Sequence, residues 1–234
     1  MTPRASIVIP VYNEGAAIIA CLERLVESVE TPCEILVVFD TPDDTTREPA
    51  EDFARAHAVV KPTLNTYGRG PAHAIRYGID HSSAPVVVVT MADGSDDATQ
   101  IDAMIRLVER GVAIAVASRY MAGGSQLGAP FVKSLMSRLA GLSLCWFARV
   151  GTHDATSSFK AYDRGFVQRV GIESDAGFEI AIELVAKARR HRLPVAELPT
   201  IWLERTTGES NFKVLKWLPR YLHWYRYAFG RRIP

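Results

Sequence analysis

The sequence predicts an α/β fold with a mostly parallel central sheet and helices on both of its faces. Two observations lead to this prediction: apolar segments end abruptly in polar residues, and helical segments alternate with them. Apolar runs of this kind are typical of parallel strands buried on both faces, and the intervening helices make right-handed crossovers. The carboxyl ends of the strands then share one edge of the sheet, where ligands bind in folds of this class.

The first 120 residues follow this alternation in order. β-branched runs mark the strands, and apolar residues recurring every three or four positions mark the helices. Pro71 suits the first turn of one helix, and Gly111 ends another. The expected elements are strands, each with the polar residues that end it, at 6–14, 34–40, 59–61, 86–97 and 112–120, and helices at 15–30, 48–57, 72–81 and 98–110.

The pattern changes after Gly124. We expect a mostly apolar helix, a polar cluster, an amphipathic helix and a proline-interrupted strand, over residues 131–150, 151–159, 177–191 and 193–203. Neither an internal repeat nor a low-complexity linker divides the chain. We therefore expect one domain over residues 1–211 and an amphipathic, aromatic and basic tail over residues 212–234.

The composition narrows the function. Apolar residues make up 48% of the 234 residues, which is ample for a sizeable core. The 27 basic and 26 acidic residues nearly balance, and because the chain carries no net excess of positive charge we expect no nucleic-acid partner. Cys21, Cys33 and Cys145 lack metal-ligand spacing, which indicates reduced thiols and a cytoplasmic protein. The amino terminus shows no export leader, and no run reaches the roughly 18 apolar residues of a membrane span. Any membrane contact is therefore expected to be peripheral, at the inner face.

The segment 86–97 is the most informative part of the chain, because a run of valines ends there in Asp93, Asp96 and Asp97. Carboxylates at the carboxyl end of a parallel strand can hold Mg²⁺ or Mn²⁺, which neutralises a diphosphate. Asp and Ser are also the residues that helix starts prefer, so on these residues alone a helix cap is the stronger interpretation.

Asp40 also follows a strand, where it either binds a base or ribose hydroxyls or caps a turn. Gly68 and Gly70 either let the backbone approach a nucleotide sugar closely or form a plain turn.

Arg119, Arg138 and Arg205 carry forked donors that match phosphate oxygens, although a single arginine is more often a solvated or ion-paired surface group. His153 has no partner at ligand spacing, so we interpret it as structural. Glu183, on the expected helix 177–191, is either a functional carboxylate or the polar edge of that helix.

Six motifs occur in sequence order at 6–14, at the strand ending in Asp40, and at 65–78, 118–120, 154–160 and 204–210. Each is modest alone. Together they resemble the family 2 glycosyltransferases, specifically the dolichol-phosphate mannosyltransferase-like branch, over nearly the whole chain.

The resemblance implies a GT-A fold, a GDP- or UDP-linked sugar donor, a divalent cation and a polyprenyl phosphate acceptor. It also implies a single in-line displacement that inverts the anomeric centre. Since a phosphate acceptor is already anionic, positioning and charge neutralisation would supply most of the rate.

Residue roles carry over by position in this resemblance. The nucleotide-sugar set is Pro10, Tyr12, Glu14, Asp40, Gly68, Gly70, Asp93 and Ser210. The metal set is Asp93 with Asp96 or Asp97. The catalytic set is Asp93, Arg119, Arg138, Asp154 and Arg205. Within it, Arg119 and Arg138 match residues near the acceptor phosphate. Arg205 and Ser210 match a segment that closes over the site.

The chain departs from the family pattern twice: Phe39 replaces the first of two frequent aspartates, and the segment 92–97 moves the second metal carboxylate and lacks a following glutamine. Two alternatives remain, the first motivated by the altered aspartate motif and the second by the lack of a membrane-spanning segment. One is a non-catalytic nucleotide-sugar or partner-binding protein. The other is a soluble transferase to a hydroxyl, which would need Asp154 or Asp96 as a base.

The tail leaves two interpretations open. Its aromatic and basic residues suit a helix lying in a lipid interface, and they equally suit a helix packed on the core or on a second copy in a homo-oligomer.

Overall fold

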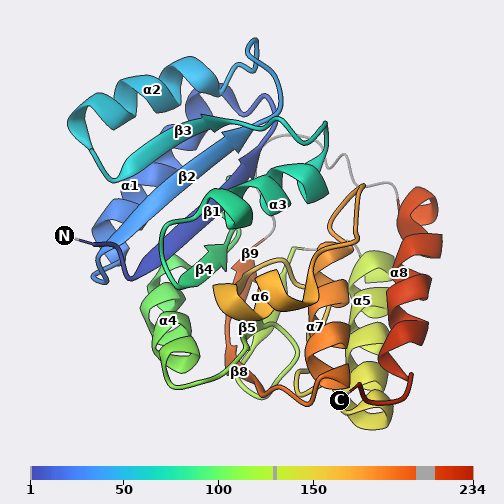
Figure 1. Cartoon of the computed structure of the whole chain (residues 1–234). Helices are drawn as coiled ribbons and strands as arrows, with labels where there is room; N and C mark the ends of the chain where they lie inside the picture. Colours follow the sequence, from blue (N-terminus) through green and yellow to red (C-terminus); the bar gives the residue numbers. More distant parts are fainter. Residues whose placement is uncertain (1, 129–130, 204–213, 234) are drawn as a thin grey trace.

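The computed structural model describes residues 2–128, 131–203 and 214–233, with the backbone alone for 131–133 and 214–217 (Figure 1). Within these residues, seven strands form one sheet in the order β3-β2-β1-β4-β7-β5-β8, and β6 pairs with β9. The strands are β1 (Ala5–Val11), β2 (Cys33–Phe39), β3 (Val60–Leu64), β4 (Val86–Val89), β5 (Ile114–Ser118), β6 (Ser125–Leu127), β7 (Lys160–Asp163), β8 (Val195–Pro199) and β9 (Ile201–Leu203).

Helices cover both faces of the sheet (Figure 1). Alternate residues of β1 point to opposite faces, so that Ile7 and Ile9 join one core cluster while Val8 joins the other. The helices of the Ile7 side are α1 (Ile18–Ser28), α2 (Arg47–Ala56) and α4 (Ile101–Glu109). Those of the Val8 side are α3 (Pro71–His81), α6 (Arg164–Val170), α7 (Ile180–Arg190), α8 (Val214–Ala228), and α5 (Phe131–Ser143) with the π-helical turn Leu144–Ala148 that continues it.

The sheet confirms the predicted fold class and adds one antiparallel strand. β1 pairs in parallel with β2 and β4, and β5 pairs in parallel with β8. β7 lies between β4 and β5 and is antiparallel to both, so β4 and β5 still run in one direction. The polar turns after β1, β2, β4 and β5 therefore lie at one edge of the sheet, as expected.

β7 and α6 were not predicted, because β7 carries a lysine and an aspartate where buried strands are usually apolar. Lys160 is nevertheless fully buried in it. The expected helix 131–150 is α5 and its π-helical turn, and it ends where Arg149 adopts a left-handed conformation with φ 56°.

Helix α8 packs against the domain. Trp224 and Ala228 are buried in the core, and Tyr225 Oη donates a hydrogen bond of 3.0 Å to Ser143 Oγ of α5. The described part of the tail thus has one face on the core, and the division at residue 211 stays a prediction. Among the described helices, none has both the length and the apolar character needed to cross a bilayer.

Candidate active site at the carboxyl edge of the sheet

The turn after β1 is held by the turn after β2. Asp44, which is buried, accepts hydrogen bonds from the backbone N–H of Asn13 (3.1 Å) and Thr46 (2.8 Å). Asn13 has φ 55°, a left-handed conformation in which Asn is common. Pro10 lies within β1, Tyr12 is 62% exposed, and the backbone N–H of Glu14 donates to Thr46 Oγ1 at 2.9 Å. This arrangement leaves the Tyr12 ring open to solvent beside a fixed backbone.

Asp40 holds the glycine-rich loop. Its Oδ1 accepts from Asn65 Nδ2 at 2.8 Å, and its Oδ2 accepts from the Gly70 backbone N–H at 2.7 Å. Gly68 and Gly70 have φ of 125° and 115°, which L side chains rarely adopt. A Cβ at Gly70 would meet the Ala176 carbonyl oxygen at 3.0 Å. In the described residues both glycines thus serve a turn that Asp40 fixes in place.

The loop after β4 brings two predicted metal ligands together. Asp93 Oδ1 accepts from Ser95 N–H (3.1 Å) and Oγ (2.6 Å), and Asp96 Oδ2 accepts from Thr90 Oγ1 (2.9 Å) and Met91 N–H (3.1 Å). Burial, with the charge of Asp93 as a further cause, raises the pKa of Asp96 to about 6, against hydrogen bonds that lower it. Asp93 and Asp96 stand three positions apart on this loop, and their like charges oppose each other.

Asp97 is a helix cap. Its Oδ1 accepts hydrogen bonds from Thr99 N–H (3.1 Å) and Thr99 Oγ1 (2.7 Å) at the start of the short 3₁₀ helix Ala98–Gln100. The capping interpretation therefore describes Asp97 in this structure. Across the described residues, no three His, Cys, Asp or Glu side chains form a ready metal cage. Asp93 and Asp96 supply hard oxygen donors and an unfavourable negative pair, which fits a divalent cation completed by ligands from a substrate.

Two further contacts hold this loop, and neither was predictable from the sequence pattern. Arg24 of α1 donates from Nη1 to the Gly94 carbonyl oxygen at 3.0 Å. The Leu203 N–H, at the end of β9, donates to the Ser95 carbonyl oxygen at 3.3 Å. The predicted site residues Arg205 and Ser210 lie outside the described residues.

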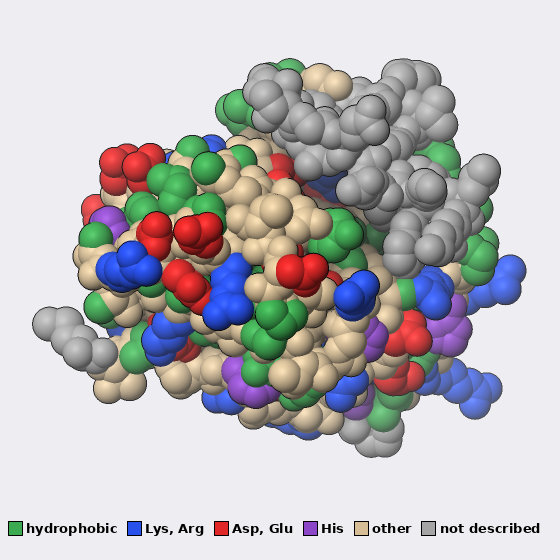
Figure 2. Space-filling model, turned by 90° about the horizontal axis from the view of Figure 1, so that it is seen from above, with side chains coloured by type: hydrophobic (Ala, Val, Ile, Leu, Met, Phe, Trp, Pro, Cys, Tyr) green, Lys and Arg blue, Asp and Glu red, His purple; other side chains and the backbone are tan. Residues whose placement is uncertain are grey.

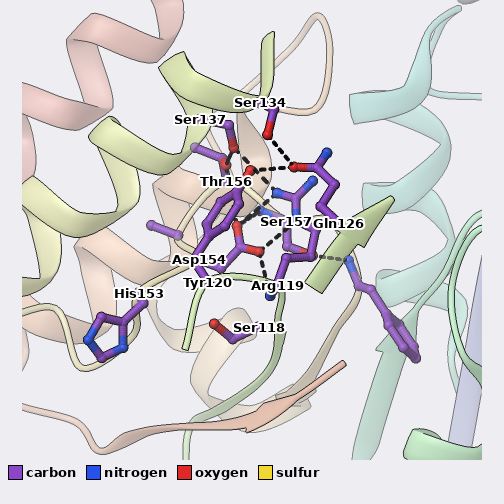
Figure 3. A network of polar contacts seen from close by, with 12 residues as sticks. Ser118, Arg119, Tyr120, Gln126, Ser134, Ser137, His153, Asp154, Thr156 and Ser157 are labelled. Atoms are coloured by element: carbon purple, nitrogen blue, oxygen red, sulfur yellow. Dashed lines mark hydrogen bonds and ion pairs between the residues drawn. The ribbon is translucent and has the colours of Figure 1, made fainter. Parts of the chain in front are cut away.

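Arg119 and Asp154 form the central ion pair of the edge (Figure 3). Arg119 Nε and Nη2 donate to the two carboxylate oxygens of Asp154 at 2.7 and 2.8 Å, and the Arg119 backbone N–H donates to Asp154 Oδ2 at 3.1 Å. Asp154 is fully buried and the Arg119 side chain is 12% exposed. Burial alone would raise the pKa of Asp154, but the adjacent guanidinium outweighs it and the pKa is lowered.

The ion pair extends into a hydroxyl network on α5. Arg119 Nη2 reaches Ser137 Oγ at 3.4 Å, and Ser137 Oγ shares a 2.7 Å hydrogen bond with Thr156 Oγ1 (Figure 3). Gly141, one turn further along α5, admits close packing, because a Cβ there would meet the His153 carbonyl oxygen at 2.1 Å. Arg119 Nη1 makes no hydrogen bond within the described part of the chain. Arg138, which follows Ser137, is exposed.

Lys160 is a buried charge of this edge that we did not predict. Its ammonium group donates to the carbonyl oxygens of Ala155, at 3.2 Å, and Ser157. Burial lowers the pKa of Lys160 to about 7, although the charge of Asp154 acts in the opposite direction. Lys160 therefore fixes the 155–157 turn beside the ion pair.

His153 and Glu183 have structural roles. His153 Nδ1 lies 2.5 Å from Glu197 Oε1, and its ring points away from the Arg119 network (Figure 3). Glu183 is buried in α7, where it accepts from the backbone N–H groups of Glu173 (2.7 Å) and Ser174 (2.8 Å) and pairs with Lys187 at 2.7 Å.

The electrostatics join the β4 loop to the β5 loop. The charge of Arg119 lowers the pKa of Asp96, and the charge of Asp96 raises that of Arg119. Figure 2 shows acidic and basic side chains mixed over the described part of the surface that is seen from above. Carboxylates of the β4 loop can bind a cation, and the guanidinium of Arg119 can bind a phosphate next to it.

Comparison with protein families gives one match over most of the chain: the model described as glycosyl transferase family 2 matches residues 6–171.

Curated relatives cover the chain at low identity. Polyprenol monophosphomannose synthase of Mycolicibacterium smegmatis is 27% identical, over 92% of this chain and 87% of that protein. Dolichol-phosphate mannosyltransferase of Pyrococcus furiosus is 29% identical over 90% of this chain, which spans 59% of that longer protein. Undecaprenyl-phosphate mannosyltransferase of Micrococcus luteus is 24% identical, over 89% of this chain and 87% of that protein.

Solved structures share the fold. A mannosyltransferase from Pyrobaculum calidifontis, in complex with GDP-Man and Mn²⁺, superposes with a TM-score of 0.62 at 19% identity, over 90% of this chain and 59% of that one. Glucosyl-3-phosphoglycerate synthase from Mycobacterium tuberculosis, in complex with Mn²⁺, UDP and glucosyl-3-phosphoglycerate, superposes with a TM-score of 0.66 at 16% identity, over 99% of this chain and 81% of that one. These likenesses confirm the predicted GT-A fold.

Proposed function

The chain belongs to glycosyl transferase family 2, and on this premise we propose that it transfers a hexose from a GDP- or UDP-linked donor to a polyprenyl phosphate. One observation carries the proposal: the carboxylates of the β4 loop and the guanidinium of Arg119, which follows β5, lie at the same edge of the sheet. Through a divalent cation the carboxylates can hold the diphosphate of a donor, and the guanidinium fits the phosphate of an acceptor. The curated relatives, whose names are those of polyprenyl-phosphate mannosyltransferases, support this acceptor class.

Asp93 and Asp96 would hold the cation, Mg²⁺ or Mn²⁺, because Asp97 is already committed to its helix cap. When bound, this ion neutralises the diphosphate leaving group. The exposed Tyr12 ring gives the base a surface to stack on. Asp40 keeps the Gly68–Gly70 turn at the same edge of the sheet.

Asp154 positions Arg119. Its carboxylate takes two guanidinium N–H groups, which leaves Nη1 to bind an acceptor phosphate, with the exposed Arg138 nearby on α5. A carboxylate whose pKa is lowered by a bidentate arginine is a poor general base. A phosphate oxygen needs no base to attack the anomeric carbon, whereas a hydroxyl acceptor would have to use Asp96 rather than Asp154 as its base.

The decisive experiment is a transfer assay on the full chain with GDP-mannose and UDP-glucose as donors. The acceptor is a polyprenyl phosphate of defined length, and the matched control is the same polyprenol without phosphate. We expect transfer to the phosphate alone, in the presence of Mn²⁺ or Mg²⁺ and not with chelator. Transfer to the polyprenol instead would establish the hydroxyl-acceptor alternative.

We also propose that the protein binds the membrane surface through α5. Small and apolar residues of α5 and its π-helical turn, Gly141, Leu144 and Ala148, are buried against the core. The larger apolar side chains of the same segment form a stripe that is exposed to solvent. The exposed fractions in the stripe are 43% for Leu135, 41% for Met136, 57% for Leu139, 66% for Trp146 and 74% for Phe147.

Two features favour a lipid surface as the partner that this apolar stripe binds. The exposed Arg138 and Arg149 flank it and complement anionic headgroups. The stripe also begins next to Ser134 and Ser137, which hydrogen-bond Gln126 and Arg119, so docking places the acceptor side of the site at the membrane.

Vesicle flotation tests this surface. Replacing Leu139 or Trp146 with glutamate should weaken partition to phosphatidylglycerol vesicles about tenfold, because each change removes an apolar anchor and adds repulsion. Val59→Glu is the matched control, since Val59 is 40% exposed next to β3, at the other end of the sheet. Equal losses in all three variants, or no vesicle binding by the unaltered chain, would contradict the assignment.

A further inference from the structure

A pocket lined by arginines lies at the opposite end of β5 from the candidate site. It has a volume of about 260 Å³, and its lining includes Arg149, Arg189, Arg192 and Arg232. Val195, which also lines it, pairs with Ile114 at the start of β5, whereas Arg119 follows the last residue of that strand. Five residues of strand span roughly 15 Å. The pocket is therefore separate from the donor and acceptor positions.

The four arginines have no neutralising partner within the described structure. None of them forms an ion pair with a carboxylate of the described residues. The pKa of Arg189 is lowered by partial burial and then by the charges of Arg232 and Arg190. The nearest described carboxylate on β8, that of Glu197, is taken by Thr152 and His153. Among the residues that the structure describes, like charges thus gather around a concavity, and their mutual repulsion has an energetic cost.

The arginines come from three separate segments that fold together here. Arg189 Nε donates to the Ala148 carbonyl oxygen at 2.9 Å, and its Nη1 donates to the Gly230 carbonyl oxygen, so α7 ties the π-helical turn to the C-terminal residues. Arg149 and Arg192 both have left-handed backbones, with φ of 56° and 58°. Non-glycine residues rarely adopt this conformation, and the surrounding structure must stabilise it.

Helix electrostatics explain only part of this cluster. Cations in the last turn of a helix interact favourably with its C-terminal carbonyl groups, and this accounts for Arg189 on α7. Arg149 likewise stands at the C-cap of the π-helical turn, where the same effect favours a cation. Helix electrostatics do not account for Arg232, which lies beyond the end of α8. Convergence of guanidinium groups from separate segments on one concavity is how proteins recognise phosphate, whose oxygens accept the paired N–H donors.

We propose that this pocket binds a phosphate-type oxyanion, either a soluble phosphate or the headgroup of an anionic lipid. Both sources present the same chemistry to the arginines. Trp146 and Phe147, exposed on the turn just before Arg149, offer an apolar rim that a headgroup would use and a soluble phosphate would not. The proposal stands whether or not the chain is a transferase, since it uses none of the residues assigned to transfer.

The test measures binding of inorganic phosphate by calorimetry on the full chain, with chelator present and chloride-matched ionic strength. The variant is Arg149→Gln with Arg232→Gln, which spares the carbonyl-binding Arg189. Arg110→Gln is the matched control, because Arg110 is exposed at the end of α4. Arg138→Gln separates the pocket from the acceptor position of the candidate active site, where Arg138 lies exposed on α5. We expect saturable binding that weakens at least about tenfold in the double variant and is unchanged in both controls.

Vesicles distinguish the two sources. For the vesicles the variant is Arg192→Gln with Arg232→Gln, because Arg149 also flanks the apolar stripe of α5. Loss of binding to phosphatidylglycerol vesicles in this variant, with phosphatidylcholine vesicles unbound throughout, identifies a lipid headgroup, and retained vesicle binding identifies a soluble phosphate. Phosphate binding that is absent, or equal in the double variant and the unaltered chain, overturns the proposal. Arg192→Gln provides a second variant if the double variant melts below the unaltered chain without phosphate.

Discussion

Replacing Asp93 with asparagine is expected to lower kcat/KM for sugar transfer by about 10²–10⁴-fold. Asparagine keeps a side-chain oxygen that can accept the Ser95 N–H and Oγ hydrogen bonds, so the loop should keep its shape. The substitution removes one negative charge from the carboxylate pair that fits the cation. We therefore expect weaker cation binding, and donor binding in calorimetry that no longer responds to Mn²⁺.

Asp97→Asn is the matched control for this experiment. It lies in the same loop and loses the same charge, but Asn caps helices as well as Asp does, so the 3₁₀ helix should persist. If Asp97 is a cap alone, activity should stay within about threefold of the unaltered chain. Equal losses in both variants would show that loop charge in general matters. An Asp93→Asn enzyme of normal activity would favour the non-catalytic alternative.

The sequence was most informative where a pattern is local. Each strand that ends in polar residues was predictable from a few neighbouring positions, and these turns now share one edge of the sheet. Asp97 shows the limit of the same reasoning, because three nearby aspartates look alike in sequence. Only the fold separates the cap from the pair formed by Asp93 and Asp96.

Long-range partners could not be predicted. Asp154 looked like one member of a polar cluster, and its role depends on Arg119, which lies 35 positions away. Lys160 was missed because a lysine usually marks an exposed position, and here backbone carbonyl oxygens take its N–H groups. Arg24 gives no signal on its helix, because the Gly94 carbonyl that it holds comes from a distant loop.

Asp154→Ala should cost the fold about 3–5 kcal/mol in free energy of unfolding at neutral pH. The reason is the partner left behind, because Arg119 is nearly buried and would lose both of its guanidinium hydrogen bonds to the carboxylate. Replacing Arg119 with methionine and Asp154 with leucine together should restore part of this loss, since no unpaired charge then remains. Urea unfolding of the three proteins measures the difference. A loss below about 1 kcal/mol in Asp154→Ala would contradict a buried pair.

The pH dependence of this loss gives the second half of the prediction. The folded pKa of Asp154 is lowered by Arg119 against the effect of burial, whereas the unfolded value is about 3.9. The stabilisation by the charged carboxylate is therefore complete above the unfolded pKa, and it is lost as the pH falls from there through the folded pKa. The gap between the unaltered chain and Asp154→Ala should therefore shrink below about pH 4, whereas any change of the gap between pH 7 and pH 5 reports Lys160, whose pKa the charge of Asp154 raises. A gap that is independent of pH would assign the loss to the cavity left by the side chain, and the positioning of Arg119 would then need another cause.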